Sequence, residues 1–209
     1  AEGYTVLTGD HSLRHQRPAE PLLSGLRQLG AFACSTRGNG QAPLIIQGRL
    51  KGGRASFCGR DSQPVSALLF ATALLEGETE LEVHEPGETP WINVTLDWLK
   101  RLGREVEHHK YRHYWIRGLG PHTSFDYLVP GDWSSAAYPI VAAVLTHSSL
   151  RINGLDPHDV QGDKHLVDVL RAMGAKIHWT ETGVEVLPGG DLLGLEVNVN
   201  PMIDMITLV

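Results

Sequence analysis

The chain has 209 residues, of which 42% are hydrophobic and 20% are charged, so it is long enough for one large globular domain or two small ones. Its net charge of −6 excludes the basic face that bulk nucleic-acid binding needs, although a few local cations could still hold a small anion. No apolar run approaches the roughly 20 residues that span a bilayer.

Two cysteines, Cys34 and Cys58, fit a reducing compartment. They fall in segments predicted to be neighbouring strands, which would allow a disulfide, but we expect both to be buried as small hydrophobic residues. No secretory-signal pattern opens the sequence, and we expect a cytoplasmic protein. The first residue is not Met, and we expect an internal part of a longer chain.

The first predicted elements are a strand at residues 4–8 and an amphipathic helix at residues 23–29 that ends at Gly30. Proline favours the first helical position, so we expect Arg17-Pro18 to open this helix. Arg17 could then grip a carboxylate or phosphate through two hydrogen bonds, or it could be an ordinary solvated surface residue.

The next elements are predicted strands at 31–35, 44–47 and 54–58, followed by a polar junction, Gly59-Arg60-Asp61-Ser62-Gln63. A helix of small apolar residues, 65–74, begins there. The free N–H groups and partial positive charge of a helix N-terminus suit an anion, and Ser62 and Gln63 could donate hydrogen bonds to phosphate or hydroxyl groups. The alternative is that they only cap the helix.

The same order of elements then recurs. The predicted strands are 80–84, 104–108, 114–117, 124–129, 149–153, 176–179, 184–187 and 195–199, and the predicted helices are 96–102, 136–145, 167–173 and one from Asp204 onward. Gly30, Gly103 and Gly174 end equivalent helices at intervals of about 72 residues, which indicates an internal repeat. The predicted fold is α+β, built from units of two helices and about four strands. A turn-rich segment at 118–123 divides the chain into residues 1–129 and 130–209.

Two later junctions match the first in position. Ser134 and Asp204 lie about as far beyond their helix-ending glycines as Ser62 does, at roughly 30 residues. We expect Ser134 and Ser135 to cap a helix. Asp204 lies in an apolar run and is either another cap or a general base whose partly dry setting adjusts its pKa. The eleven histidines form no metal-binding pattern, and no metal is expected.

Several motifs resemble the 5-enolpyruvylshikimate-3-phosphate (EPSP) synthase family, in order along essentially the whole chain. They are Gly9-Asp10-His11-Ser12-Leu13, Arg17-Pro18, Ser62-Gln63, Pro90-Trp91-Ile92-Asn93-Val94-Thr95, Gly131-Asp132-Trp133-Ser134-Ser135-Ala136-Ala137, Gln161-Gly162-Asp163 and Asp204. The resemblance implies βαβαββ-type units in the two-lobe enolpyruvyl transferase fold (an inverse alpha-beta barrel). Residues 1–129 would be most of one lobe, and 130–209 part of the lobe junction and a truncated further unit.

The resemblance also implies a reaction, in which the enolpyruvyl group of phosphoenolpyruvate moves to the 5-hydroxyl of shikimate 3-phosphate and phosphate is released, without a cofactor. It implies that Arg17 binds phosphoenolpyruvate, that Ser62 and Gln63 bind shikimate 3-phosphate, and that Trp91 replaces a tyrosine beside the shikimate ring. Asp204 would accept the proton of the 5-hydroxyl. We expect a monomer that binds these two small molecules, with no nucleic-acid or membrane partner.

Two residues depart from the family pattern: Asp61 stands where the family usually has serine, and Glu88 lies in a segment that is usually Ser-Lys/Arg-Pro-Tyr. A carboxylate about 4 Å from a phosphate would cost on the order of 4 kcal/mol at an effective dielectric near 20. Either both carboxylates turn away, or a cation such as Arg60 offsets them, or the site binds phosphate weakly.

Two other functions remain open from the sequence. The related UDP-N-acetylglucosamine enolpyruvyl transferases use a loop cysteine, and neither cysteine is predicted to lie in such a loop. A non-catalytic module on the same fold would explain Asp61 and Glu88 as signs of lost binding. The family's Lys-Ser, Glu, Arg, His-Arg and Lys segments have no counterpart here, so we expect little catalysis from these 209 residues alone.

Overall fold

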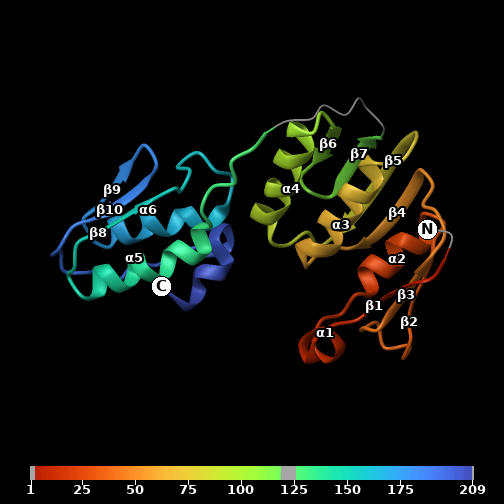
Figure 1. The fold of residues 1–209 in the computed structure, drawn as a ribbon, viewed down its shortest axis with the longest axis horizontal. Coiled ribbons are helices and arrows are strands. Elements are labelled where there is room, and N and C mark those ends of the chain that lie inside the picture. Colours follow the sequence, from red (N-terminus) through yellow and green to blue (C-terminus); the bar gives the residue numbers. More distant parts are fainter. Residues whose placement is uncertain (1–2, 119–125, 209) are drawn as a thin grey trace. The chain divides into compact units, whose positions relative to one another are not determined.

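The computed structural model describes residues 3–118 and 126–208 (Figure 1). By its internal contacts the chain forms two compact units, residues 1–124 and 125–209, and each is described by itself. In the part of the chain that the structure describes, no helix has the length and apolar character needed to cross a bilayer.

The first unit contains two sheets and four helices within its described residues. Its elements are β1 (Thr5–Leu7), α1 (His11–His15), α2 (Glu20–Gln28), β2 (Phe32–Ser35), β3 (Leu44–Gln47), β4 (Gly53–Cys58), α3 (Ser62–Ala73), β5 (Glu78–His84), α4 (Thr89–Arg101), β6 (Glu105–His109) and β7 (His113–Arg117). One sheet has the order β1-β3-β2 and the other β4-β5-β7-β6. The run β4-α3-β5-α4-β6-β7 is therefore one βαβαββ unit.

Strand β5 shows why the four-stranded sheet has one covered face. Thr79, Leu81 and Val83 are buried, while the alternating glutamates of the strand lie on the opposite face, as the two-residue period of a strand requires. Figure 1 shows α3 and α4 together over this sheet. Helix α3 is apolar on most sides, and seven of its twelve residues are buried, as expected for a helix packed between other elements.

Within its described residues, the second unit is a three-stranded antiparallel sheet with two α-helices and two 3-10 helices. Its elements are α5 (Trp133–Leu145), β8 (Leu150–Asn153), η1 (Gly162–Lys164), α6 (His165–Ala172), β9 (Ile177–Thr180), β10 (Gly183–Val186) and η2 (Asn200–Thr207). The sheet order is β8-β10-β9. The core of this unit includes Ile140, Leu166, Val184 and Met202, each no more than 1% exposed.

The three glycine-ended helices are confirmed. Gly30, Gly103 and Gly174 have positive φ angles of 92°, 70° and 110°. After each glycine the next backbone N–H donates to a carbonyl five residues earlier, at 3.0, 2.8 and 2.9 Å. This is the Schellman arrangement, in which a left-handed glycine satisfies the last carbonyl groups of a helix.

Two predicted strands are not formed. Residues 126–129 and 195–199 have no strand assignment, and the first part of the earlier segment lies outside the described residues. Alternating apolar residues favour an extended chain, but a strand exists only where a neighbouring strand accepts and donates its backbone hydrogen bonds. In the described part of the second unit, β8, β9 and β10 pair only with one another.

The predicted start of the first helix was wrong by a few residues. Helix α2 begins at Glu20, so Arg17 and Pro18 lie in the link that joins it to α1. Pro21 occupies the first-turn position that proline favours, and this second proline, rather than Pro18, sets the start.

The predicted surroundings of the cysteines were also wrong. Cys34 lies in β2 and Cys58 in β4, which belong to different sheets rather than to neighbouring strands. Both thiols are free, and Cys58 is exposed rather than buried.

Candidate active site

The loops that follow β4 and β5 meet at one edge of the four-stranded sheet. These strands pair in parallel, with Cys58 opposite His84, so their carboxyl ends lie side by side. In open sheets that contain parallel strands, ligand sites form beyond the carboxyl ends of those strands. The first of these loops leads into α3 and the second into α4, which brings Ser62 and Gln63 close to the start of the Trp91 helix.

Asp61 is the residue that caps α3. Its backbone is extended, and its Oδ1 accepts a hydrogen bond from the N–H of Gln63 at 2.8 Å. The alternative in which Ser62 or Gln63 is the cap is therefore wrong, because both residues already lie in the first helical turn. A carboxylate at this end is stabilised by the positive end of the helix dipole.

Glu88 fills the space in front of Ser62. Its Oε2 accepts one hydrogen bond from the backbone N–H of Ser62 at 3.1 Å and another from Ser62 Oγ at 2.9 Å. Ser62 is 1% exposed, whereas Gln63 is exposed. Glu88 therefore does not turn away from the junction, which was one of the expected ways to accommodate its charge.

Backbone contacts hold the two loops together. Gly59 N–H donates to the carbonyl of His84 at 2.8 Å, and Gly87 N–H donates to the carbonyl of Gly59 at 2.9 Å. Arg60 forms an ion pair with Glu85 at 2.5 Å. Arg60, the expected offsetting cation, is thus engaged by a different carboxylate.

Trp91 lies in the first turn of α4 and is half-buried. Its backbone N–H donates to the carbonyl of Glu88 at 3.0 Å. Trp91 is therefore bonded through its backbone to the residue that contacts Ser62. Farther along the same helix, Thr95 Oγ1 donates to Ser66 Oγ at 2.7 Å and fixes α4 against α3. The structure therefore brings Ser62, Gln63 and Trp91 to one edge of the sheet.

Arg17 lies apart from this group in the chain, in the link between α1 and α2. Its side chain is exposed, and its Nε donates to Ser12 Oγ at 3.3 Å. In the described residues no hydrogen bond or ion pair joins Arg17 to Ser62 or Gln63. Its guanidinium is open to an anion, and its predicted role in binding phosphoenolpyruvate stays a prediction.

The junction of the second unit is organised by Asp132, which caps α5. Its carboxylate accepts backbone hydrogen bonds from Ser134 at 3.2 Å and Ser135 at 3.0 Å, and hydroxyl bonds from the same residues at 2.8 and 2.6 Å. The two serines therefore donate to the cap, and the prediction that they are the cap was wrong.

Gln161 links this cap to the rest of the unit. Its Nε2 donates to Asp132 Oδ1 at 2.7 Å, and its Oε1 accepts from the N–H of Trp133 at 2.9 Å. Burial opposes the ionisation of Asp132, but hydrogen bonds from Ser135, Gln161 and Ser134 outweigh it. They hold the pKa of Asp132 well below its usual range.

Asp163 and Asp204 lie on adjacent 3-10 helices of the same unit, η1 and η2. Asp163 is 3% exposed, and burial followed by repulsion from the Asp204 carboxylate raises its pKa. Asp204 itself is exposed and lies inside η2, so it neither caps a helix nor has the predicted partly dry setting. The sequence singled out Gln161 and Asp163 only as parts of a family motif, with no role for either.

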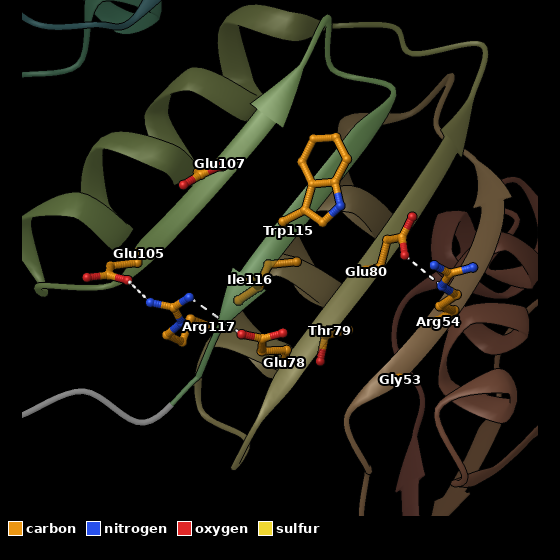
Figure 2. Close-up of a pocket in the computed structure, with 10 residues that line it drawn as sticks. All are labelled: Gly53, Arg54, Glu78, Thr79, Glu80, Glu105, Glu107, Trp115, Ile116 and Arg117. Atoms are coloured by element: carbon orange, nitrogen blue, oxygen red, sulfur yellow. Dashed lines mark hydrogen bonds and ion pairs between the residues drawn. The ribbon is translucent and has the colours of Figure 1, made fainter.

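A cavity elsewhere on the first unit does not match these residues. It measures about 460 Å³ and lies on the four-stranded sheet (Figure 2). Figure 2 shows two groups of paired charges in its lining: Arg54 with Glu80 at 2.6 Å, and Arg117 with Glu105 and Glu78 at 3.2 and 3.5 Å. Among the described residues, its lining includes none of the predicted site residues.

No metal centre is indicated by the side chains. Within residues 3–118 and 126–208, no group of three or more His, Cys, Asp or Glu residues is arranged to hold a metal ion.

The sequence motifs point to the same family as comparisons with known proteins. The whole chain, residues 1–209, matches the family model described as EPSP synthase (3-phosphoshikimate 1-carboxyvinyltransferase). The chain belongs to the EPSP synthase family. The predicted resemblance and the α+β enolpyruvyl transferase fold are thereby confirmed.

Curated relatives in this family cover nearly the whole chain. A 3-phosphoshikimate 1-carboxyvinyltransferase of Methanothrix thermoacetophila is 44% identical over 206 residues, which are 96% of this chain and 48% of the relative. That of Acetivibrio thermocellus is 38% identical over 203 residues, with 97% and 48% covered. The chain thus spans about half the length of the curated relatives it matches.

Solved structures give the same fold. The EPSP synthase from Acinetobacter baumannii superimposes with a TM-score of 0.74 at 26% identity, covering 97% of this chain and 48% of that one. The enolpyruvyl transferase NikO from Streptomyces tendae gives a TM-score of 0.62 at 23% identity, covering 89% and 44%, which supports the fold alone.

Proposed function

We propose that this chain is part of an enzyme that transfers the enolpyruvyl group of phosphoenolpyruvate to the 5-hydroxyl of shikimate 3-phosphate. The observation that carries the proposal is the match of all 209 residues to the EPSP synthase family, with relatives named for this activity. The reaction belongs to the shikimate pathway of aromatic amino acid biosynthesis.

The reaction needs a base for the attacking hydroxyl and donors for two anionic substrates. The 5-oxygen forms a bond to C2 of phosphoenolpyruvate while C3 takes up a proton, giving a tetrahedral intermediate. Loss of phosphate and of one C3 proton then restores the double bond. We assign Asp204 as the acceptor of the hydroxyl proton, and its exposure on η2 leaves the carboxylate open to a substrate.

The first unit would bind the substrates. We assign Ser62 and Gln63 to shikimate 3-phosphate, Trp91 to a place beside its ring, and Arg17 to phosphoenolpyruvate. The sheet-edge position of Ser62, Gln63 and Trp91 supports the first two assignments. The exposed guanidinium of Arg17 can offer two parallel hydrogen bonds to a carboxylate or phosphate.

The remaining features of the proposal come from the family. Residues 1–129 would form most of one lobe, and 130–209 part of the lobe junction and a further repeat unit. We propose a cytoplasmic monomer that needs no metal or organic cofactor. The UDP-sugar alternative is not favoured, because Cys34 and Cys58 are strand residues and neither supplies a loop cysteine. One observation favours the non-catalytic alternative: the Glu88 carboxylate accepts the hydrogen bond of the Ser62 N–H, which a ligand phosphate would otherwise accept.

Titration of the full-length protein with shikimate 3-phosphate, with and without phosphoenolpyruvate, tests the proposal. We expect saturable binding of shikimate 3-phosphate that becomes tighter when phosphoenolpyruvate is present. Absence of binding in both titrations would contradict the proposal and support the non-catalytic alternative.

A further inference from the structure

The N-terminus of α3 has no backbone donor left in its first turn. The three residues that follow the cap are Ser62, Gln63 and Pro64. Proline has no N–H, so only Ser62 and Gln63 could donate to a ligand. Asp61 accepts from Gln63, and Glu88 accepts from Ser62, so two internal carboxylates use both donors.

The two carboxylates differ in what they do for the chain. Asp61 is the local cap, one residue before the helix, as in most helices. Glu88 comes from the next loop, 26 residues away, and accepts from Ser62 Oγ as well as from its N–H. It makes no side-chain capping bond to α4, the helix that it precedes. Its carboxylate therefore binds the N-terminus of α3 and not that of α4.

The backbone of the two loops places Glu88 in this position. Its backbone is left-handed, with φ 47° and ψ 40°, a conformation that is uncommon for residues other than glycine. A Cβ on the preceding residue, Gly87, would lie 2.3 Å from the carbonyl oxygen of Arg60, so only glycine permits this approach of the two loops. Contacts of Gly87 with the Gly59–Arg60 loop thus keep the backbone of Glu88 close to the N-terminus of α3.

We propose that Glu88 sets the affinity of this site by occupying, with its own carboxylate, the place where the anionic group of the ligand would bind to Ser62. A ligand phosphate takes these two hydrogen bonds only when the Glu88 side chain moves away. Ser62 is buried, so its N–H and Oγ lose free energy of hydrogen bonding if they are left without an acceptor. The ligand phosphate must therefore replace the Glu88 carboxylate as that acceptor. The inference rests on the proposed function in taking shikimate 3-phosphate as the ligand.

Two substitutions separate the charge of Glu88 from its hydrogen bonds. Glu88→Gln keeps a carbonyl acceptor for Ser62 and removes the negative charge, so the site stays closed by a neutral group that an anion displaces more easily. Glu88→Ala removes the acceptor. Glu82→Gln is the matched control, because Glu82 is an exposed residue of β5 and the change removes the same charge from the same unit.

The test measures dissociation constants for inorganic phosphate and for shikimate 3-phosphate on the full-length protein by calorimetry. We expect both to bind at least tenfold more tightly to the Glu88→Gln and Glu88→Ala variants than to the wild type, and Glu82→Gln to change binding less than twofold. In a Ser62→Ala background, which lacks the hydroxyl that Glu88 contacts, Glu88→Gln should increase the affinity for phosphate no more than threefold. Thermal melting confirms that each variant is folded. If Glu88→Ala is unstable, the comparison of Glu88→Gln with the wild type is sufficient for the test.

The results separate the two proposals. Unchanged or weaker phosphate binding by folded Glu88→Gln protein overturns the role of Glu88, whether or not shikimate 3-phosphate binds. An equal gain in the Ser62→Ala background contradicts the assignment of the displaced contact to Ser62 Oγ, because this variant lacks the hydroxyl and keeps only the backbone N–H. A gain for phosphate without any preference for shikimate 3-phosphate supports the role of Glu88 and contradicts the proposed function.

Discussion

Gln161 donates a hydrogen bond to Asp132 over 2.7 Å, and this bond joins the start of η1 to the cap of α5. The same side chain accepts a hydrogen bond from the backbone N–H of Trp133. One amide side chain therefore binds both the cap, Asp132, and the first helical residue, Trp133. At the start of α5, the Asp132 carboxylate thus accepts hydrogen bonds from Gln161, Ser134 and Ser135, which favour its ionised form.

Asp132 should stabilise the second unit in a pH-dependent way. Because hydrogen bonds lower its pKa in the folded protein, its contribution is complete above its ordinary pKa of 3.8 and is lost as the pH falls below that value. We expect Asp132→Ala to lower the free energy of unfolding at pH 7 by about 1 kcal/mol, the usual effect of losing a cap.

Denaturant unfolding at several pH values measures this effect. The difference between wild type and Asp132→Ala should shrink between pH 4 and pH 2, while Asp168→Asn, an exposed change on α6, should show little effect at any pH. A difference that stays constant down to pH 2 would contradict the role of the ionised cap.

Asp163 should act in the opposite direction. Burial and the nearby Asp204 raise its pKa, so the folded protein holds this proton more tightly than the unfolded chain. Its stabilising contribution is present at low pH and is lost as the pH rises through its folded pKa. We expect Asp163→Asn to remove this dependence, so that unfolding free energy falls less from pH 4 to pH 7 than in the wild type. Parallel pH profiles for the two proteins would be inconsistent with a raised pKa of Asp163.

Asp61 should contribute to stability as a cap rather than to ligand binding as a charge. We expect Asp61→Ala to lower the free energy of unfolding by about 1 kcal/mol and Asp61→Asn to change it by only a few tenths, because asparagine caps helices as well as aspartate. Chemical denaturation of the three proteins provides the comparison. Equal losses for both variants would mean that the charge of Asp61, and not its capping bond, is what stabilises α3.

Gly87 should be sensitive to the smallest side chain. A Cβ at this position would lie 2.3 Å from a backbone oxygen of Arg60, which cannot be relieved by a rotamer change. We expect Gly87→Ala to lower the free energy of unfolding by about 2 kcal/mol, as overpacking commonly does. Gly3→Ala is the control, because nothing lies within 4 Å of its Cβ position. Similar melting temperatures for both variants would show that the two loops are not held closely.

Local patterns predicted the parts of this fold that local physics determines. The glycine-ended helices were found because helical periodicity, a cation in the last turn and a left-handed glycine all depend on near neighbours. The strands predicted at 124–129 and 195–199 were wrong over their described residues, because a strand depends on a partner that alternation does not reveal. The choice of Pro18 over Pro21 failed because both residues fit the same local rule.

The sequence identified the site junction but not its internal contacts. Gly59 to Gln63 has the composition of a loop before a helix, so its position was predictable. The bond from Ser62 to Glu88 joins residues that are 26 apart, and it depends on the parallel pairing of β4 and β5 and on a left-handed backbone at Glu88. The importance of Asp163 was not predictable either, because it comes from burial and from η2, which lies distant in the chain.

The most direct test of the account is phosphate release by the full-length protein from phosphoenolpyruvate and shikimate 3-phosphate. We predict turnover that requires both substrates and that falls at least a thousandfold in a folded Asp204→Ala variant, consistent with the loss of a general base. The 209 residues alone should release phosphate at a negligible rate. Absence of turnover by the full-length protein would contradict the proposed function, and undiminished turnover by Asp204→Ala would exclude Asp204 as the base.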